Sequence, residues 1–136
     1  MPTLKVERVH GPARRAIIKG LMAFNTRAVG PWNFERISIT LRHRNAIVGG
    51  LSADTYLGWM YISLLWVSDD HRGQGFGSKL MKAAEKEARR RGIKQAWVDT
   101  FSFQAPAFYR KLGYRQFGRL KDFPAGGYRS FLTKAL

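Results

Sequence analysis

One stretch near the middle of the chain constrains the fold more than any other, the segment from Leu64 to Met81. It begins with four consecutive apolar residues, Leu64 to Val67, which is typical of the end of a buried strand. A polar turn follows, and then an amphipathic helix that places its apolar residues on one face before Gly92 ends it. Those residues are Leu80, Met81, Ala84 and Ala88. A strand, a turn and a helix in direct succession predict an α/β protein.

The turn itself, Arg72 to Ser78, carries glycine at alternate positions: Gly73, Gly75 and Gly77. The first turn of a helix has N–H groups without internal partners, and the helix dipole adds positive potential there. Glycine lets the backbone approach an anion closely, and Arg72 adds a forked cationic donor. The pattern therefore favours a phosphate-binding site, and a glycine-rich turn without a ligand stays open as the alternative.

Two familiar phosphate motifs do not match this turn. A P-loop needs glycine followed by Lys-Ser or Lys-Thr, and no such pair follows a glycine here. The dinucleotide fingerprint G-x-G-x-x-G would need a third glycine at position 78, which is serine. What remains is an R-G-x-G-x-G pattern between a strand and a helix.

The length of the chain and its hydrophobic periodicity predict one mixed α/β domain, residues 1–136, with a mostly antiparallel sheet and about three helices. We expect one parallel strand pair, formed through a right-handed crossover after the glycine turn. The predicted strands are Thr3–Val9, Ile37–Leu41, Ala46–Ala53 with a bulge at Gly49-Gly50, Gly58–Val67, Ala96–Phe101, Tyr114–Gly118 and Tyr128–Leu132. The predicted helices are Ala13–Met22, the one after the glycine turn, and a short one within Ser102–Tyr114.

Composition excludes several classes of site. The chain has no cysteine, and its three histidines show no ligand spacing, so we expect no metal. No apolar run is long enough for a leader or a membrane span, which makes a cytoplasmic protein the default expectation. The net charge of +15 leaves nucleic-acid binding as a minority alternative, because the densest basic cluster, Arg89 to Arg91, fits a solvated helix end.

Two motifs in the expected order resemble the GNAT superfamily of N-acetyltransferases, and in particular its small bacterial members. The signature [RQ]-x-x-G-x-[GA] is matched by Arg72, Gly75 and Gly77. About 30 residues later, a second family element is matched by Ala107, Phe108, Tyr109, Lys111, Gly113 and Tyr114, with Gln104 near the usual asparagine. Two ordered motifs are more specific than either one alone.

The resemblance implies a GNAT-like sheet whose parallel strands splay at an acetyl-CoA site. It implies direct transfer of an acetyl group to a primary amine of a small molecule or peptide. Tyr109 matches the family's general acid, and the strand bearing Leu65 to Val67 is expected to hold the acetyl carbonyl through N–H groups freed by a bulge. The residues expected to bind the cofactor are Leu65, Trp66, Val67, Arg72, Gly73, Gln74, Gly75, Phe76, Gly77, Ser78, Gln104, Ala107, Phe108 and Lys111.

Several expectations rest on the residues alone. Asp99, near the end of a strand, is the best candidate for a general base, and a structural carboxylate is the alternative. The basic chain favours a neutral, zwitterionic or acidic amine as acceptor, although Asp54, Asp69, Asp70, Asp99 and Asp122 could build a local acidic pocket. Four aromatic residues could line a pocket for the acceptor: Trp32, Phe34, Tyr56 and Trp59.

Three other outcomes stay open at this point. The chain could be an acyl-CoA-binding module without catalysis, or a basic nucleic-acid-binding protein. Edge strands of a small sheet also allow a homodimer.

Overall fold

The computed structural model describes all residues from 1 to 136. They form two compact units, Met1–Trp32 and Asn33–Leu136. The first unit contains α1 (His10–Val29), and the second contains a six-stranded sheet with two further helices. No helix combines the length and the apolar character that crossing a bilayer requires. That one domain spans the whole chain stays a prediction.

In the first unit, α1 is longer than the sequence predicted, and the strand expected at Thr3–Val9 is not formed. Alternation alone does not make a strand, because an isolated segment has no partner for its backbone hydrogen bonds. His10, Gly11 and Pro12, which separate the expected strand from the expected helix, form the first turn of α1. Proline is tolerated there because the N–H it lacks would have had no partner in the helix. Gly30 ends the helix at a φ of 77°.

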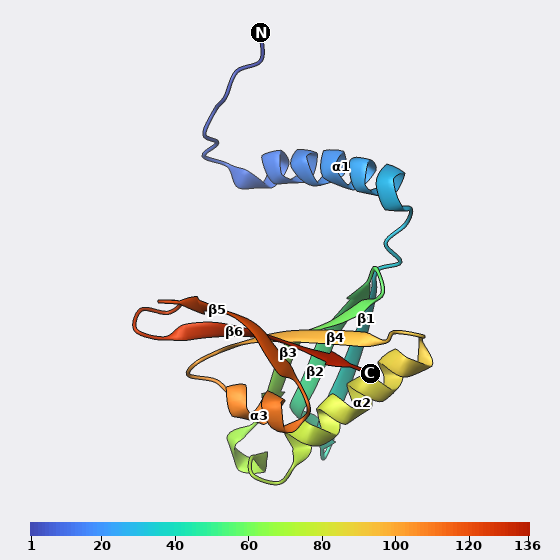
Figure 1. Ribbon diagram of the computed structural model, residues 1–136, viewed down its shortest axis with the longest axis vertical. Helices are drawn as coiled ribbons and strands as arrows, with labels where there is room; N and C mark the ends of the chain where they lie inside the picture. Colours follow the sequence, from blue (N-terminus) through green and yellow to red (C-terminus); the bar gives the residue numbers. More distant parts are fainter. The chain divides into compact units, whose positions relative to one another are not determined.

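In the second unit the strands lie in the order β1-β2-β3-β4-β6-β5, so β6 is inserted between β4 and β5 (Figure 1). All neighbours are antiparallel except β3 and β4. The elements are β1 (Glu35–His43), β2 (Ala46–Tyr56), β3 (Trp59–Val67), the single 3₁₀ turn η1 (Asp69–His71), α2 (Phe76–Arg90), β4 (Gln95–Phe101), α3 (Pro106–Lys111), β5 (Arg115–Lys121) and β6 (Tyr128–Ala135). This is the mixed fold that the sequence predicted.

The hairpin of β1 and β2 has a tight turn, an irregularity in its strand pairing, and a glycine at a close contact with β3. Arg44 and Asn45 turn the chain between β1 and β2 with φ values of 50° and 67°. The irregularity in the pairing of β1 with β2 lies just beside the predicted Gly49-Gly50 bulge, opposite Leu41 and Arg42. A Cβ on Gly49 would lie 2.9 Å from the Trp66 carbonyl oxygen, so glycine is required there for the close approach of β3.

The parallel pairing of β3 with β4 is short. It covers Trp59–Ile62 on β3 and Gln95–Val98 on β4, and the remainder of β3, from Ser63 to Val67, has no β4 partner. The two strands separate toward their carboxyl ends, where η1 and the start of α2 follow β3 (Figure 1). The sheet therefore contains an unpaired strand edge in its interior.

Packing of α2 explains why one face of the sheet is closed. The helix buries small residues, Ala84 and Ala88, against Ile37, Ala53 and Met60, all in the core cluster. Small side chains let the helix axis come close to the sheet. Residues that alternate with the core positions face the other way, among them Tyr61, Trp97 and Asp99. That second face is where the cleft described next has its outer end.

Candidate functional site

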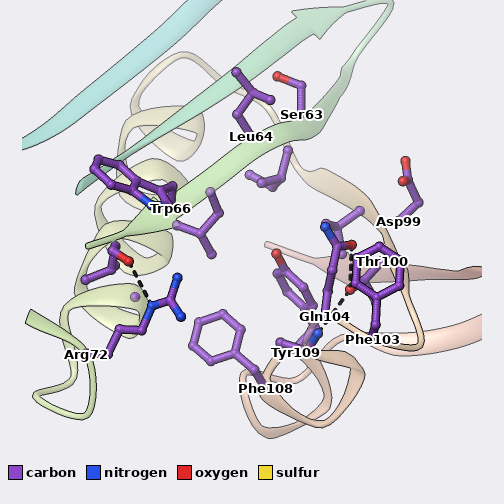
Figure 2. A pocket seen from close by; sticks show the side chains of 16 residues that line it. Ser63, Leu64, Trp66, Arg72, Asp99, Thr100, Phe103, Gln104, Phe108 and Tyr109 are labelled. Atoms are coloured by element: carbon purple, nitrogen blue, oxygen red, sulfur yellow. Dashed lines mark hydrogen bonds between the residues drawn. The ribbon is translucent and has the colours of Figure 1, made fainter. Parts of the chain in front are cut away.

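A cleft of about 590 Å³ lies between the separating ends of β3 and β4. Figure 2 shows Arg72 toward one end and Asp99 toward the other, with Tyr109 and Gln104 between them. The strand β3 contributes the residues from Ile62 to Val67. The remaining lining residues are Arg72, Gly77, Val98, Asp99, Thr100, Phe103, Gln104, Ala105, Phe108 and Tyr109.

The glycine turn presents a row of backbone donors. The first hydrogen bond of α2 runs from the Lys79 N–H to the Gly75 carbonyl oxygen, at 3.1 Å. The N–H groups of residues 73–78 therefore donate to no protein acceptor. Gly73 and Gly75 have φ values of 74° and 81°, which an L side chain rarely adopts. This arrangement suits the phosphate oxygens predicted to bind here.

The third glycine adds a packing role to its predicted place in the turn. Gly77 does not have a positive φ and lies in the first turn of α2, where its N–H has no protein acceptor. A Cβ at this position would lie 3.2 Å from Cζ of Phe108 on α3. The absence of a side chain therefore lets the Phe108 ring come close to the start of α2 beside the cleft.

Arg72 is held at the rim by two contacts. Its Nε donates to the Val67 carbonyl oxygen at 3.0 Å, and Nη1 lies 3.2 Å from Asp69 Oδ1. The side chain still has 62% of its surface exposed. A fixed, exposed guanidinium beside a row of free N–H groups adds positive charge where an anion would bind.

Tyr109 contributes the cleft's phenol. It is 8% exposed and packs against Phe108 and Tyr114, but its hydroxyl has no hydrogen-bond partner in the protein. Figure 2 shows this hydroxyl pointing away from α3 and into the cleft. Burial, with a smaller contribution from the charge of Asp99, raises the pKa of Tyr109 to about 12. The phenol is therefore protonated at neutral pH and available as a donor.

Gln104 occupies the position of the expected asparagine, and its amide orientation is fixed by chemistry. The Phe101 N–H can only donate, so the atom 2.8 Å from it is the amide oxygen Oε1. The NH₂ group is then left without a protein partner and is available to the cleft. The side chain is thus anchored to the end of β4 and offers one donor from there.

Asp99 lies on β4 and is more fully engaged than its prediction as a base assumed. Oδ1 accepts from Nε and Nη2 of Arg129 at 2.9 and 2.7 Å, and Oδ2 accepts from the Tyr61 hydroxyl at 2.8 Å. Burial and this hydrogen bond raise the pKa of Tyr61 to about 12. Sequence reasoning missed both partners, because they lie 30 and 38 positions away and no motif links them.

The structure divides the predicted site residues into two groups. The cleft brings together Leu65, Trp66, Val67, Arg72, Gly77, Asp99, Gln104, Phe108 and Tyr109. It is not lined by Gly73, Gln74, Gly75, Phe76, Ser78, Ala107 or Lys111, although the first five belong to the turn with the free N–H groups. The bulge in β3 lies at Ser63, between the partners of Ser52 and Ala53, and not at Leu65 to Val67. An extra residue there shifts the side-chain alternation, which leaves Leu64 and Trp66 exposed.

Of the acidic residues predicted for an acceptor pocket, Asp99 lines the cleft and the other four do not. Phe34 stacks on Tyr56, and Trp59 lines a separate shallow apolar hollow. Each of three predicted acidic-pocket residues, Asp54, Asp69 and Asp99, is paired with an arginine. The pairs are Asp54 with Arg36, Asp69 with Arg72, and Asp99 with Arg129.

Comparison with known proteins decides the family. Residues 20–114 match the model of the acetyltransferase (GNAT) family. The chain belongs to the GNAT acetyltransferase family. It is 37% identical over 123 residues to the acetyltransferase Atu2258 of Agrobacterium fabrum, covering 90% of both chains. It is 39% identical over 94 residues to the blasticidin-S acetyltransferase of Streptomyces morookaense, covering 68% of this chain and 69% of that one.

Solved structures agree with this GNAT assignment. The crystal structure of an acetyltransferase from Agrobacterium tumefaciens superposes with a TM-score of 0.90 at 34% identity and covers 100% of both chains. A GNAT acetyltransferase from Elizabethkingia anophelis, solved with acetyl-CoA bound, has a TM-score of 0.61 at 21% identity and covers 71% of this chain and 74% of that one. The enzyme class and the fold that the sequence predicted are thus confirmed.

Proposed function

We propose that this GNAT enzyme transfers an acetyl group from acetyl-CoA directly to a primary amine of a small molecule. One observation carries the proposal: the cleft joins an unpaired edge of β3, the partnerless Tyr109 hydroxyl and Arg72 beside the free N–H groups of the glycine turn. The name of the blasticidin-S acetyltransferase, a relative, gives a small molecule as its acceptor. That acceptor is not assigned to this chain.

The residues present fit acetyl-CoA at both ends of the cleft. Free N–H groups from Gly73 to Ser78, with Arg72, suit a pyrophosphate. The unpaired edge of β3 offers backbone groups to an amide-containing chain and to a carbonyl oxygen. A neighbour of the same fold has been solved with acetyl-CoA bound, which supports this choice of donor.

When bound, acetyl-CoA supplies an acetyl thioester that a neutral amine can attack. The C–N bond forms, the C–S bond breaks, and the thiolate needs a proton. Tyr109 is protonated at neutral pH, so it would donate a hydrogen bond to the leaving sulfur and pass it a proton, which water in the cleft would then return to the phenolate. We propose that solvent water takes the proton from the amine, because all the hydrogen bonds of Asp99 are directed at Arg129 and Tyr61.

The test begins with calorimetric titration of the protein with acetyl-CoA and with desulfo-CoA at two salt concentrations. We expect saturable one-to-one binding that persists in moderate salt. An amine panel, assayed by thiol release, then identifies acceptors. With one of them, Tyr109→Phe should lower kcat by about 10²-fold or more while the Kd for acetyl-CoA stays unchanged.

Tyr128→Phe is the matched control, because that tyrosine lies under Arg119 and does not line the cleft. Its kcat should equal that of the wild type. If Tyr109→Phe also turns over at the wild-type rate, the acid assignment is wrong. If the protein binds no acetyl-CoA, or binds only at low salt, the proposed function is wrong.

A further inference from the structure

At the outer end of the cleft, the carboxylate of Asp99 is neutralised by Arg129, which lies just outside the lining, and is not a free acid. Asp99 has only 10% of its side chain exposed, and Arg129 has 26%. Their side chains lie on the same face of the sheet, one on β4 and one on β6, and these two strands pair antiparallel. With two N–H donors from Arg129 and one O–H donor from Tyr61, the carboxylate is satisfied and its charge is balanced.

Most acidic side chains elsewhere in the molecule are also paired with a basic one. Seven of the nine acidic side chains have a lysine or arginine partner: Glu7, Glu35, Asp54, Asp69, Glu85, Glu87 and Asp99. The other two, Asp70 and Asp122, do not line the cleft. Arg72 and Asp99 are the charged side chains that do. An acceptor with several ammonium groups would therefore meet a protein of charge +15 and find no uncompensated carboxylate in the cleft.

Arg129 offers a second binding edge. Its Nε and one Nη2 hydrogen point at Asp99, and no protein acceptor takes the hydrogens of Nη1 or the second hydrogen of Nη2. This outer edge has the two-pronged geometry that binds a carboxylate. The guanidinium lies 5.1 to 5.3 Å from the ring centres of Phe101, Phe123 and Phe131, which keep it in place and reduce its contact with water.

We infer that the acceptor is an amino carboxylate whose carboxylate group binds the outer edge of Arg129 while its amine enters the cleft. The inference rests on the proposed acetyl transfer. Asp99 acts in it as a positioning residue, because it fixes the inner edge of the guanidinium. Exposed apolar side chains flank this end of the cleft, Leu64 at 68% and Phe103 at 70%, so an acceptor with an apolar body suits it.

The test compares acceptors that differ only in the carboxylate. Phenylalanine, phenylalaninamide and phenethylamine are assayed with acetyl-CoA, and kcat/KM is expressed per neutral amine because their amine pKa values differ. In the wild type, phenylalanine should exceed the other two by about tenfold or more, the value of a charge-assisted hydrogen-bonded pair. A diamine, 1,5-diaminopentane, should be a poor acceptor.

Arg129→Gln should abolish the preference through KM for phenylalanine, leaving the kcat and the Kd for acetyl-CoA within about twofold of the wild type. Arg129→Lys keeps the charge and should retain part of the preference. Arg119→Gln is the control, because Arg119 stacks on Tyr128 and does not line the cleft. A merely structural arginine would change kcat or stability, not the ratio between acid and amide.

The outcomes separate this inference from the proposed function. Equal kcat/KM for the acid and the amide in the wild type overturns the inference, as does an unchanged ratio in Arg129→Gln, while acetylation of any amine upholds the proposed function. If Arg129→Gln does not fold, the wild-type comparison and Arg129→Lys decide the matter. If no acetyl-CoA binds, both are overturned.

Discussion

Two triads, each with a carboxylate held by a tyrosine and a basic residue, lie on opposite faces of the sheet and differ in what can reach them. On the helix-covered face, Glu85 accepts from the Tyr114 hydroxyl at 2.8 Å and lies 3.0 Å from Lys134 Nζ, with 4% of its side chain exposed. On the other face, Asp99 is held by Tyr61 and Arg129. The first connects α2 to β6 inside the core, whereas the second lines a cleft. The comparison shows that the two carboxylates differ less in the types of their partners than in whether a ligand can reach them.

The largest expected effect comes from removing each carboxylate. Glu85→Ala leaves the partly buried Lys134 and the buried Tyr114 hydroxyl without their shared partner, and should lower the free energy of unfolding by about 3 kcal/mol. Asp99→Ala should cost less stability, because water in the cleft can hydrate Arg129, but it should lower kcat/KM for the acceptor. Urea denaturation followed by circular dichroism measures the first quantity, and the thiol-release assay measures the second.

If Glu85→Ala and Asp99→Ala lost the same unfolding free energy, the expected difference between the buried triad and the cleft triad would be wrong. A matched control is Glu87→Ala, since Glu87 is on the same helix as Glu85 but pairs with Arg90 and Arg91 at the surface. Surface ion pairs contribute little, so the urea midpoint of this variant should stay close to that of the wild type.

Removing the tyrosine hydroxyl from each triad should have a smaller effect on stability and tests the same difference between the two triads. Tyr114→Phe removes a donor from a buried carboxylate and should cost about 1–3 kcal/mol of unfolding free energy. Tyr61→Phe should cost about 1 kcal/mol or less, because Asp99 keeps both hydrogen bonds from Arg129. Urea midpoints of the two variants, measured side by side, check the order. The reverse order would mean that the cleft triad is the more important one for stability.

The smallest effect is a pH dependence that the triads share. The pKa of Tyr61 is raised to about 12, and burial also raises that of Tyr114, compared with about 10 in an unfolded chain. Above pH 10 the unfolded state loses protons that the native state keeps, so stability should fall as pH rises from about 10 to 12 and be unaffected by these groups below that range. Urea midpoints at pH 8, 10 and 11 test this. Tyr61→Phe should make the decline shallower, and an unchanged slope would contradict the assignment.

How much could be predicted from the sequence depended on how local the signal was. The helix after the glycine turn, the β1–β2 hairpin and the general position of the cleft follow from periodicity and motif. Local patterns misled at the N-terminus, where alternation in Thr3–Val9 had no partner strand, and they gave no sign that Phe108, on another helix, packs close to Gly77.

The outer end of the site could not be predicted for a different reason. Arg129 reaches Asp99 only because β6 enters the sheet between β4 and β5, and strand order is set by long-range packing. Nothing in the residues near Arg129 distinguishes it from the other basic residues of a chain with 24 lysines and arginines. The pairing register of two strands decides which of those cations faces Asp99.

The sheet's two outer strands suggest a purpose for part of the positive charge. β1 and β5 lie at the two ends of the strand order and carry Arg36, Arg42, Arg115, Arg119 and Lys121. An edge strand has free backbone groups that can pair with another molecule, and like charges along it oppose such pairing. The third free edge, on β3, lines the cleft. Positive charge on β1 and β5 thus disfavours pairing at the two outer edges and leaves the β3 edge, inside the cleft, as the place where backbone groups are offered to a ligand.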